Sequence, residues 1–233
     1  MNEKPWKKWS SVSGVLAPLF LAHALCTTPS IAAEASSASG PKIETGFANV
    51  NGTRLYYEIA GTGDPIVLVH GNFGDRRYFD GPFDVLARVH RVLRYDIRGD
   101  GKSMLPEEGV PSCDFEDLEA LMTHLDIDRA HIAGFSLGSG TAVDFCLAYP
   151  NPRRVLTPPA AEQLEKIAVP ALIITAEYDL DACRAVAQQM DTRIPDSAMV
   201  DLASATHFMF MEEPEKVNAA MLDFLVYAST TIT

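Results

Sequence analysis

The residues best suited to chemistry form the run Gly134-Phe135-Ser136-Leu137-Gly138, a G-x-S-x-G pattern. The run lies between a predicted strand and a predicted helix, and a serine nucleophile is typical of such a strained strand-to-helix turn. Gly134 and Gly138 give the room that the close backbone approach around the turn requires. The pattern therefore predicts that Ser136 is a nucleophile.

Two backbone N–H groups are candidates for an oxyanion hole beside this serine. The Leu137 amide comes at the start of the predicted helix, where it is unpaired and the helix dipole favours negative charge. A second donor is expected from the loop His70-Gly71-Asn72-Phe73-Gly74, which follows a short apolar strand. We assign this donor to the Asn72 N–H, with Phe73 as the alternative, and expect His70 to brace the loop.

Strand patterns and helix patterns alternate along the chain. Apolar or β-branched runs alternate with segments whose apolar residues recur at helical spacing. The predicted strands are residues 53–59, 66–69, 91–95, 131–135, 171–175 and 199–202, and the predicted helices are residues 83–89, 114–125, 137–148, 160–167, 181–190 and 214–227. This order predicts an α/β fold, with a mostly parallel sheet covered by helices on both faces and an antiparallel hairpin of the first two strands.

Five motifs in this order resemble the α/β hydrolases, and they lie at residues 70–74, 95–103, 134–138, 169–179 and 206–214. Within that fold the chain is most similar to the esterase and enol-lactonase branch, over roughly residues 45–228. The resemblance implies a triad in the chain order serine, acid, histidine, with each member on a loop at the carboxyl end of a strand. It implies no cofactor.

A serine hydroxyl needs a base that removes its proton and a carboxylate that orients the base. In the implied order, Asp179 follows the fifth predicted strand and His207 follows the sixth. We therefore predict Asp179 as the acid and His207 as the base. Asp181, which resembles the N-cap of the next helix, remains an alternative acid, and Glu177 is a weaker one. Structural or surface roles are expected for His90, His124 and His131.

The chain departs from the family pattern at two places. The residue before His207 is Thr206, where the family usually has glycine. Relatives place a lid of several helices before the strand at residues 171–175, whereas only about twenty residues separate this strand from the preceding helix here. We expect residues 151–159 to hold one strand at most, and Ser136 and His207 to lie in a shallow cleft.

The N-terminal segment has the pattern of a secretory signal peptide. Lys4, Lys7 and Lys8 precede an apolar run at residues 15–25, and small residues near position 33 offer a cleavage site. Residues 1–33 are predicted to be removed, which implies export to the periplasm or outside the cell. The apolar run is shorter than the ~20 residues of a spanning helix, so no stable membrane insertion is expected after cleavage.

After the signal peptide, residues 34–44 are predicted to be a disordered linker and residues 45–230 to form one α/β hydrolase domain. The whole chain has 19 Lys and Arg against 31 Asp and Glu, and without residues 1–33 its net charge becomes −14. Such a charge repels phosphate backbones and excludes nucleic acid as a partner. The remaining cysteines, which allow at most one disulfide and lack the spacing of a metal site, are Cys113, Cys146 and Cys183.

These observations together predict a serine hydrolase that cleaves small-molecule carboxylic esters or lactones through an acyl-enzyme intermediate. Two alternatives remain open. One is cofactor-free perhydrolase or lyase chemistry on the same triad, and the other is a binding protein whose triad is a relict. The sequence determines neither the natural substrate nor the oligomeric state.

Overall fold

Five strands form a mixed sheet in the computed structural model, which describes residues 40–106, 108–109, 113–148 and 159–231. The strand order is β1-β2-β4-β3-β5. The strands are β1 (Glu44–Val50), β2 (Thr53–Ala60), β3 (Pro65–Val69), β4 (Arg91–Tyr95) and β5 (His131–Gly134). Strand β2 is antiparallel to β1 and β4, whereas β3 is parallel to β4 and β5. The sheet is therefore parallel on the side that carries Ser136.

The predicted hairpin exists, but its strands are not the predicted pair. Residues 53–59 were expected to pair with residues 66–69, whereas β2 pairs with β1, which was not among the predicted strands. The prediction that residues 34–44 are a disordered linker is wrong at Glu44, which is the first residue of β1. Asn51 and Gly52 join β1 and β2 with φ angles of 43° and 71°. An Asn-Gly pair with two positive φ angles is the preferred two-residue hairpin turn, so this dipeptide was the available signal.

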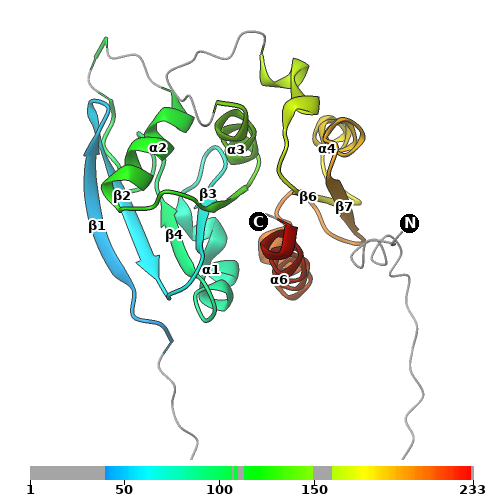
Figure 1. Cartoon of the computed structure of the whole chain (residues 1–233), viewed down its shortest axis with the longest axis horizontal. Coiled ribbons are helices and arrows are strands. Elements are labelled where there is room, and N and C mark those ends of the chain that lie inside the picture. The colour runs from blue at the N-terminus through cyan, green and yellow to red at the C-terminus, as the bar shows by residue number, and fades with distance from the viewer. Residues whose placement is uncertain (1–39, 107, 110–112, 149–158, 232–233) are drawn as a thin grey trace, which may run out of the picture.

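Two further strands, β6 (Ala171–Ala176) and β7 (Ser197–Leu202), form a separate parallel sheet. The α/β fold class is confirmed, but the prediction of a single sheet is wrong, because β5 and β6 share no backbone hydrogen bonds. Figure 1 shows β6 and β7 standing apart from the larger sheet. The molecule consequently has two halves, of which the first ends with helix α3 and the second begins after it.

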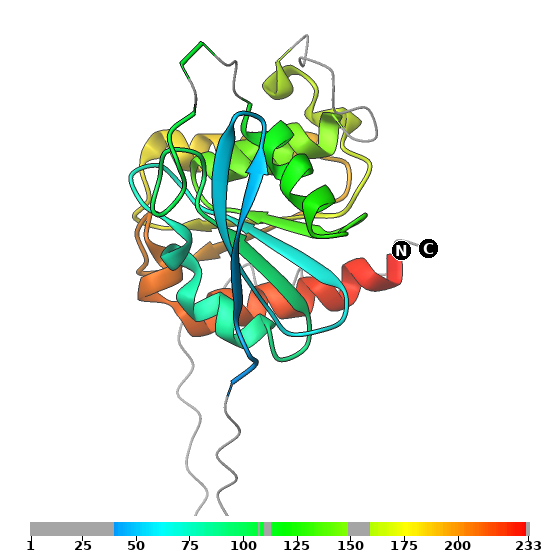
Figure 2. The same cartoon turned by 90° about the vertical axis from the view of Figure 1, so that its left-hand side faces the viewer.

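Helices cover both faces of the larger sheet, and alternate residues of β3 show how. Val67 and Val69 face a core shared with α2 (Asp114–His124) and α3 (Leu137–Ala148), whereas Ile66 and Leu68 face the opposite core. The opposite core contains α1 (Asp80–Leu86) and α6 (Pro214–Thr231), together with side chains of β6 and β7. This core therefore joins the two halves, and Figure 2 shows α6 running along the lower side of the molecule beside α1.

The connection from α3 to β6 is short. Its described part holds two 3-10 turns, η3 (Ala160–Glu162) and η4 (Leu164–Lys166), where one short helix was predicted. No lid helix occurs among the described residues of this connection, but residues 149–158 lie outside them, as do the predicted signal peptide and most of the linker. Nor is any helix in the described ranges long and apolar enough to cross a bilayer.

Candidate active site

Ser136 stands on a sharp turn between β5 and α3, as its motif predicts. Its φ angle is +52°, a strained value for a residue with a side chain, and the residue is exposed. The turn is close-packed, because a Cβ at Gly134 would collide with the Gly138 carbonyl and a Cβ at Gly138 with the Val69 carbonyl. Side chains at the two glycine positions would therefore displace Ser136.

The loop that follows β3 packs directly against this turn. A Cβ at Gly71 would lie 2.9 Å from the Ser136 Cβ. His70 is fully buried; its Nε2 accepts a hydrogen bond from the Ile97 N–H at 2.9 Å, so its Nδ1 carries a proton and donates to the Gly71 carbonyl at 2.8 Å. His70 therefore braces the loop, as predicted.

Buried ion pairs hold the same loop against the sheet. Arg76 donates to Glu58 Oε1 at 2.7 Å and to Asp96 Oδ2 at 3.0 Å, and Arg94 donates to Glu58 Oε2. Burial raises the pKa of Glu58, but the hydrogen bonds and charges of the two arginines outweigh it, and the pKa is lowered overall. The network keeps Glu58 charged and fixes the segment after β3.

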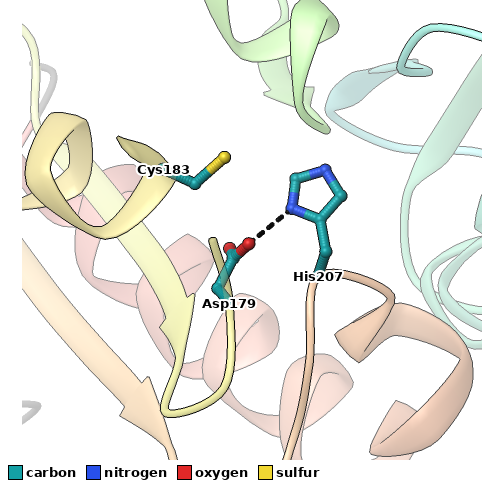
Figure 3. Close-up of side chains that lie close together, drawn as sticks. All are labelled: Asp179, Cys183 and His207. Atoms are coloured by element: carbon teal, nitrogen blue, oxygen red, sulfur yellow. Dashed lines mark hydrogen bonds and ion pairs between the residues drawn. The ribbon is translucent and has the colours of Figure 1, made fainter. Parts of the chain in front are cut away.

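Asp179 and His207 are hydrogen-bonded to each other (Figure 3). Asp179 Oδ1 lies 2.7 Å from His207 Nδ1, and the two side chains are 6% and 23% exposed. Asp179 Oδ1 also accepts the Leu180 N–H at 2.7 Å. A carboxylate in this position fixes the imidazole with its proton on Nδ1 and its Nε2 free to act as a base.

The competing carboxylates do not contact His207. Asp181 is exposed and is the first residue of α4 (Asp181–Arg193), so the prediction that it caps this helix is wrong, since the N-cap is Leu180 and no side chain caps the helix. Glu177 instead accepts the Ser204 N–H at 3.1 Å. The structure therefore favours Asp179 as the partner of His207.

The loops that carry Asp179 and His207 are tied together. The Glu177 N–H donates to the Leu202 carbonyl and the Tyr178 N–H to the Ala205 carbonyl, both at 3.0 Å. The predicted departure at Thr206 has a structural role, because its N–H and its hydroxyl both donate to the Glu212 carboxylate. These hydrogen bonds lower the pKa of Glu212. Glu212 was not among the predicted site residues. The only feature of the sequence that pointed to it was the threonine at position 206, where the family usually has glycine.

Ser136 lies in the first half of the molecule, whereas Asp179 and His207 lie in the second, on the other side of the join between the two halves. No hydrogen bond connects the Ser136 hydroxyl to His207 in the structure, although all three residues line one cavity. The ring centroids of Phe135 and His207 lie 5.0 Å apart, so the base lies close to the residue that precedes the serine. Catalytic hydrogen bonds are often open without substrate, so this arrangement is compatible with proton transfer.

The predicted oxyanion donors are an exposed residue next to Ser136 and an exposed residue of the loop after β3. Leu137 is the first residue of α3, so its N–H has no acceptor within the helix. Asn72 is exposed on the loop after β3, and neither residue lines the cavity. Phe73, the alternative donor, has a φ angle of +60° and a side chain that is 98% exposed.

The cavity has a volume of about 500 Å³ and is mostly apolar. It runs between the facing edges of β5 and β6 and is also lined by residues of α3, α4 and α6. His131 lies at its far end, at the start of β5, and burial is the main cause that lowers its pKa. The cavity is deeper than the predicted shallow cleft, because the two strands that face each other are not paired.

Cys183 is a further residue of the site that the sequence did not identify. It lies on the first turn of α4, and its sulfur, an Asp179 oxygen and a His207 nitrogen all lie within 4.8 Å of one another. Burial and the neighbouring carboxylate raise the pKa of the thiol, which is therefore protonated at neutral pH and poorly suited to be a nucleophile. Cys113, Cys146 and Cys183 are all free thiols.

Comparison with known proteins agrees with this architecture. A protein of Synechocystis sp., whose name proposes a non-heme chloroperoxidase activity, is 36% identical over 115 residues, which cover 48% of this chain and 42% of that protein. The chain matches the curated relatives over less than half of their own length.

Solved structures align over a larger part of the chain. The enol-lactonase of Burkholderia xenovorans aligns with a TM-score of 0.67 and 23% identity, over 78% of this chain and 100% of the other. The carboxylesterase CesB of Bacillus subtilis aligns with a TM-score of 0.69 and 18% identity, over 79% and 93%. Residues 64–157 match the family model of the alpha/beta hydrolase fold. The chain therefore has the α/β hydrolase fold, and residues 64–157 carry the sequence pattern of that family.

Proposed function

We propose that this protein is a serine hydrolase that cleaves carboxylic esters or lactones of small molecules. The observation that carries the proposal is the 2.7 Å contact of Asp179 and His207 beside a cavity that Ser136 also lines. An imidazole oriented by a carboxylate next to an exposed serine on a strained turn is the arrangement that activates a hydroxyl.

In the proposed reaction, Ser136 Oγ attacks the carbonyl carbon of the substrate while His207 Nε2 takes the hydroxyl proton. Asp179 keeps the Nδ1 proton in place and stabilises the imidazolium that forms. The N–H groups of Leu137 and Asn72 stabilise the oxyanion. His207 then donates its proton to the leaving alcohol, and water hydrolyses the acyl-enzyme by the same steps in reverse.

The cavity between β5 and β6 is the proposed acyl site. Its lining includes Ala133, Val143 and Ile174, and each methylene group buried there contributes about 0.8 kcal/mol. An acyl chain of several carbons would therefore bind better than an acetyl group. Aryl esters of increasing acyl length test this, and kcat/KM is expected to rise with length before it falls. A maximum at acetyl would contradict it.

The names of the solved neighbours, an enol-lactonase and a carboxylesterase, support hydrolysis as the reaction class. The name of the Synechocystis relative favours a second candidate, perhydrolysis, in which hydrogen peroxide replaces water at the acyl-enzyme. Bromination in acetate and peroxide, compared with hydrolysis of an aryl ester, distinguishes the two reactions.

A fluorophosphonate probe tests the proposed nucleophile directly, because only an activated serine reacts with it. The purified protein is expected to be labelled at Ser136 and to hydrolyse an aryl ester, and Ser136→Ala is expected to do neither. A protein that reacts with neither reagent would instead be a binding protein with a relict triad.

The export of the protein is a separate part of the proposal. It rests on the basic residues and the short apolar run within residues 1–33. The intact mass of protein recovered from the periplasm or medium is expected to correspond to a chain that begins near Glu34. A full-length chain in the membrane fraction would contradict cleavage.

A further inference from the structure

We propose that Asp179, Cys183 and His207 form a binding site for a transition-metal ion such as Zn²⁺, and that metal bound there inhibits the hydrolase. One carboxylate oxygen, one sulfur and one imidazole nitrogen lie within 4.8 Å of one another. Figure 3 shows the Cys183 sulfur pointing toward the imidazole, on the side where Asp179 meets the ring.

The donor set selects the kind of metal. Zn²⁺ accepts sulfur, nitrogen and oxygen ligands in a tetrahedral arrangement, whereas Mg²⁺ and Ca²⁺ prefer oxygen alone. Three protein ligands leave the fourth position to water. All three residues line the cavity, which gives the ion a path to the site.

The present geometry needs only a small adjustment. Two ligands on one tetrahedral Zn²⁺ lie about 3.4 to 3.6 Å apart. The 2.7 Å contact between His207 and Asp179 must therefore widen by less than about 1 Å, and the Cys183 sulfur, which lies within 4.8 Å of both, must approach by no more than about 1.4 Å. The metal takes the place of the Nδ1 proton between the imidazole and the carboxylate.

The protons balance in this step. The Cys183 thiol loses its proton to solvent, and the proton of the imidazole moves from Nδ1 to Nε2 when Nδ1 binds the metal. Nε2 then carries hydrogen and cannot accept the proton of Ser136. Inhibition therefore rests on the proposed function of His207, whereas metal binding itself rests only on the three side chains.

Metal binding can be measured without an activity assay. We expect Zn²⁺ to bind with one-to-one stoichiometry in competition with a chromogenic chelator, and Co²⁺ to give the near-ultraviolet charge-transfer band of a thiolate ligand. Cys183→Ser is expected to lose the band and to weaken Zn²⁺ binding at least tenfold. Cys113→Ser is the matched control, since Cys113 lies at the start of α2, and it is expected to retain both properties.

Alkylation of the wild-type protein provides a test that does not depend on a variant. Zn²⁺ is expected to protect Cys183 from iodoacetamide, as mapped by mass spectrometry, and to leave the reactivity of Cys113 unchanged. A Co²⁺ spectrum without the thiolate band, or Cys183 alkylation that Zn²⁺ does not slow, would overturn the metal site. Zinc binding without inhibition of ester turnover would leave the site in place and contradict the role of His207.

Discussion

The two halves of the molecule hold their candidate catalytic residues in different ways. Ser136 follows β5, which is hydrogen-bonded to the central strand β3, and the close contacts of Gly134 and Gly138 fix its turn. Asp179 and His207 follow β6 and β7, which have no hydrogen bond to the larger sheet. The backbone positions the nucleophile, whereas side-chain packing across the join positions the acid and the base against it.

The polar interactions differ in the same way. Glu58, Arg76 and Arg94 form a network in which every side chain is at most 10% exposed. In the second half, the pair of Arg193 and Glu165 is 31% and 56% exposed. Exposed pairs contribute little to stability, whereas removal of one partner from a buried pair is costly. The first half should therefore depend far more on its charges than the second.

The largest effect is expected when a candidate catalytic side chain is removed from either half of the molecule. Ser136→Ala and Asp179→Asn should each lower kcat for an aryl ester by about a thousandfold or more, because the triad acts as a unit. Asp181→Asn is the matched control and should keep near-wild-type kcat, since Asp181 is exposed and does not contact His207. A larger loss in Asp181→Asn than in Asp179→Asn would reassign the acid.

The next largest effect is expected on stability, when one carboxylate of an ion pair is neutralised in each half. Glu58→Gln removes the carboxylate that Arg76 and Arg94 share. It should lower the free energy of unfolding by about 1 to 3 kcal/mol at neutral pH, because buried N–H donors lose their acceptor while each arginine keeps a second carboxylate, Asp96 or Asp80. Because the folded pKa of Glu58 is lowered from 4.5, its contribution is present above that pH and is lost as the pH falls through the lowered value.

Urea unfolding at about pH 7 and about pH 3 measures this difference. The deficit of Glu58→Gln relative to wild type should shrink at the lower pH. Glu165→Gln is the control in the second half and should leave the urea midpoint nearly unchanged at both pH values. Equal losses in the two variants would remove the proposed distinction between the halves.

Hydrogen exchange tests the join itself. Strand β3 is paired on both sides, whereas β6 is paired on one side only, by β7. Amides of β6 should therefore exchange at least about tenfold faster than those of β3, since strands with fewer partners open more often. Exchange followed by mass spectrometry decides this, and equal protection of the two strands would mean that the halves open as one unit.

The smallest effect is expected on kcat/KM, when the loop that carries the proposed base His207 is loosened. Glu212→Gln weakens the two hydrogen bonds from Thr206, the residue before His207, and should lower kcat/KM about two- to fivefold. Glu213→Gln is the control, because Glu213 pairs with Lys216 and not with this loop. An unchanged kcat/KM in Glu212→Gln would show that the loop of His207 is positioned without Thr206.

Local patterns predicted one part of this structure well. The helix that follows Ser136 has the predicted bounds, Leu137–Ala148, because a glycine-rich turn and a helical run are both encoded in adjacent residues. Strand β4 also has its predicted bounds. The partner of His207 agrees with the order implied by the resemblance to α/β hydrolases.

Features that depend on distant segments were not predictable in this way. The residues of β1 (ETGFANV) have little strand propensity, and their pairing with β2 depends on the Asn51-Gly52 turn. The unpaired edges of β5 and β6 follow from packing between segments about forty residues apart in sequence, which no local pattern encodes. For the same reason, the approach of Cys183 to His207 was missed.

The facing edges of β5 and β6 also bear on self-association. An unpaired strand edge can recruit a strand from another chain, and proteins usually blunt or cover such edges. Here each edge is hidden because it faces the cavity inside its own molecule. Opening of the join uncovers both edges at once, one on each half, so two open molecules can exchange halves and pair edge to edge. The rate of aggregation should then follow the opening of the join and not the global unfolding of the chain.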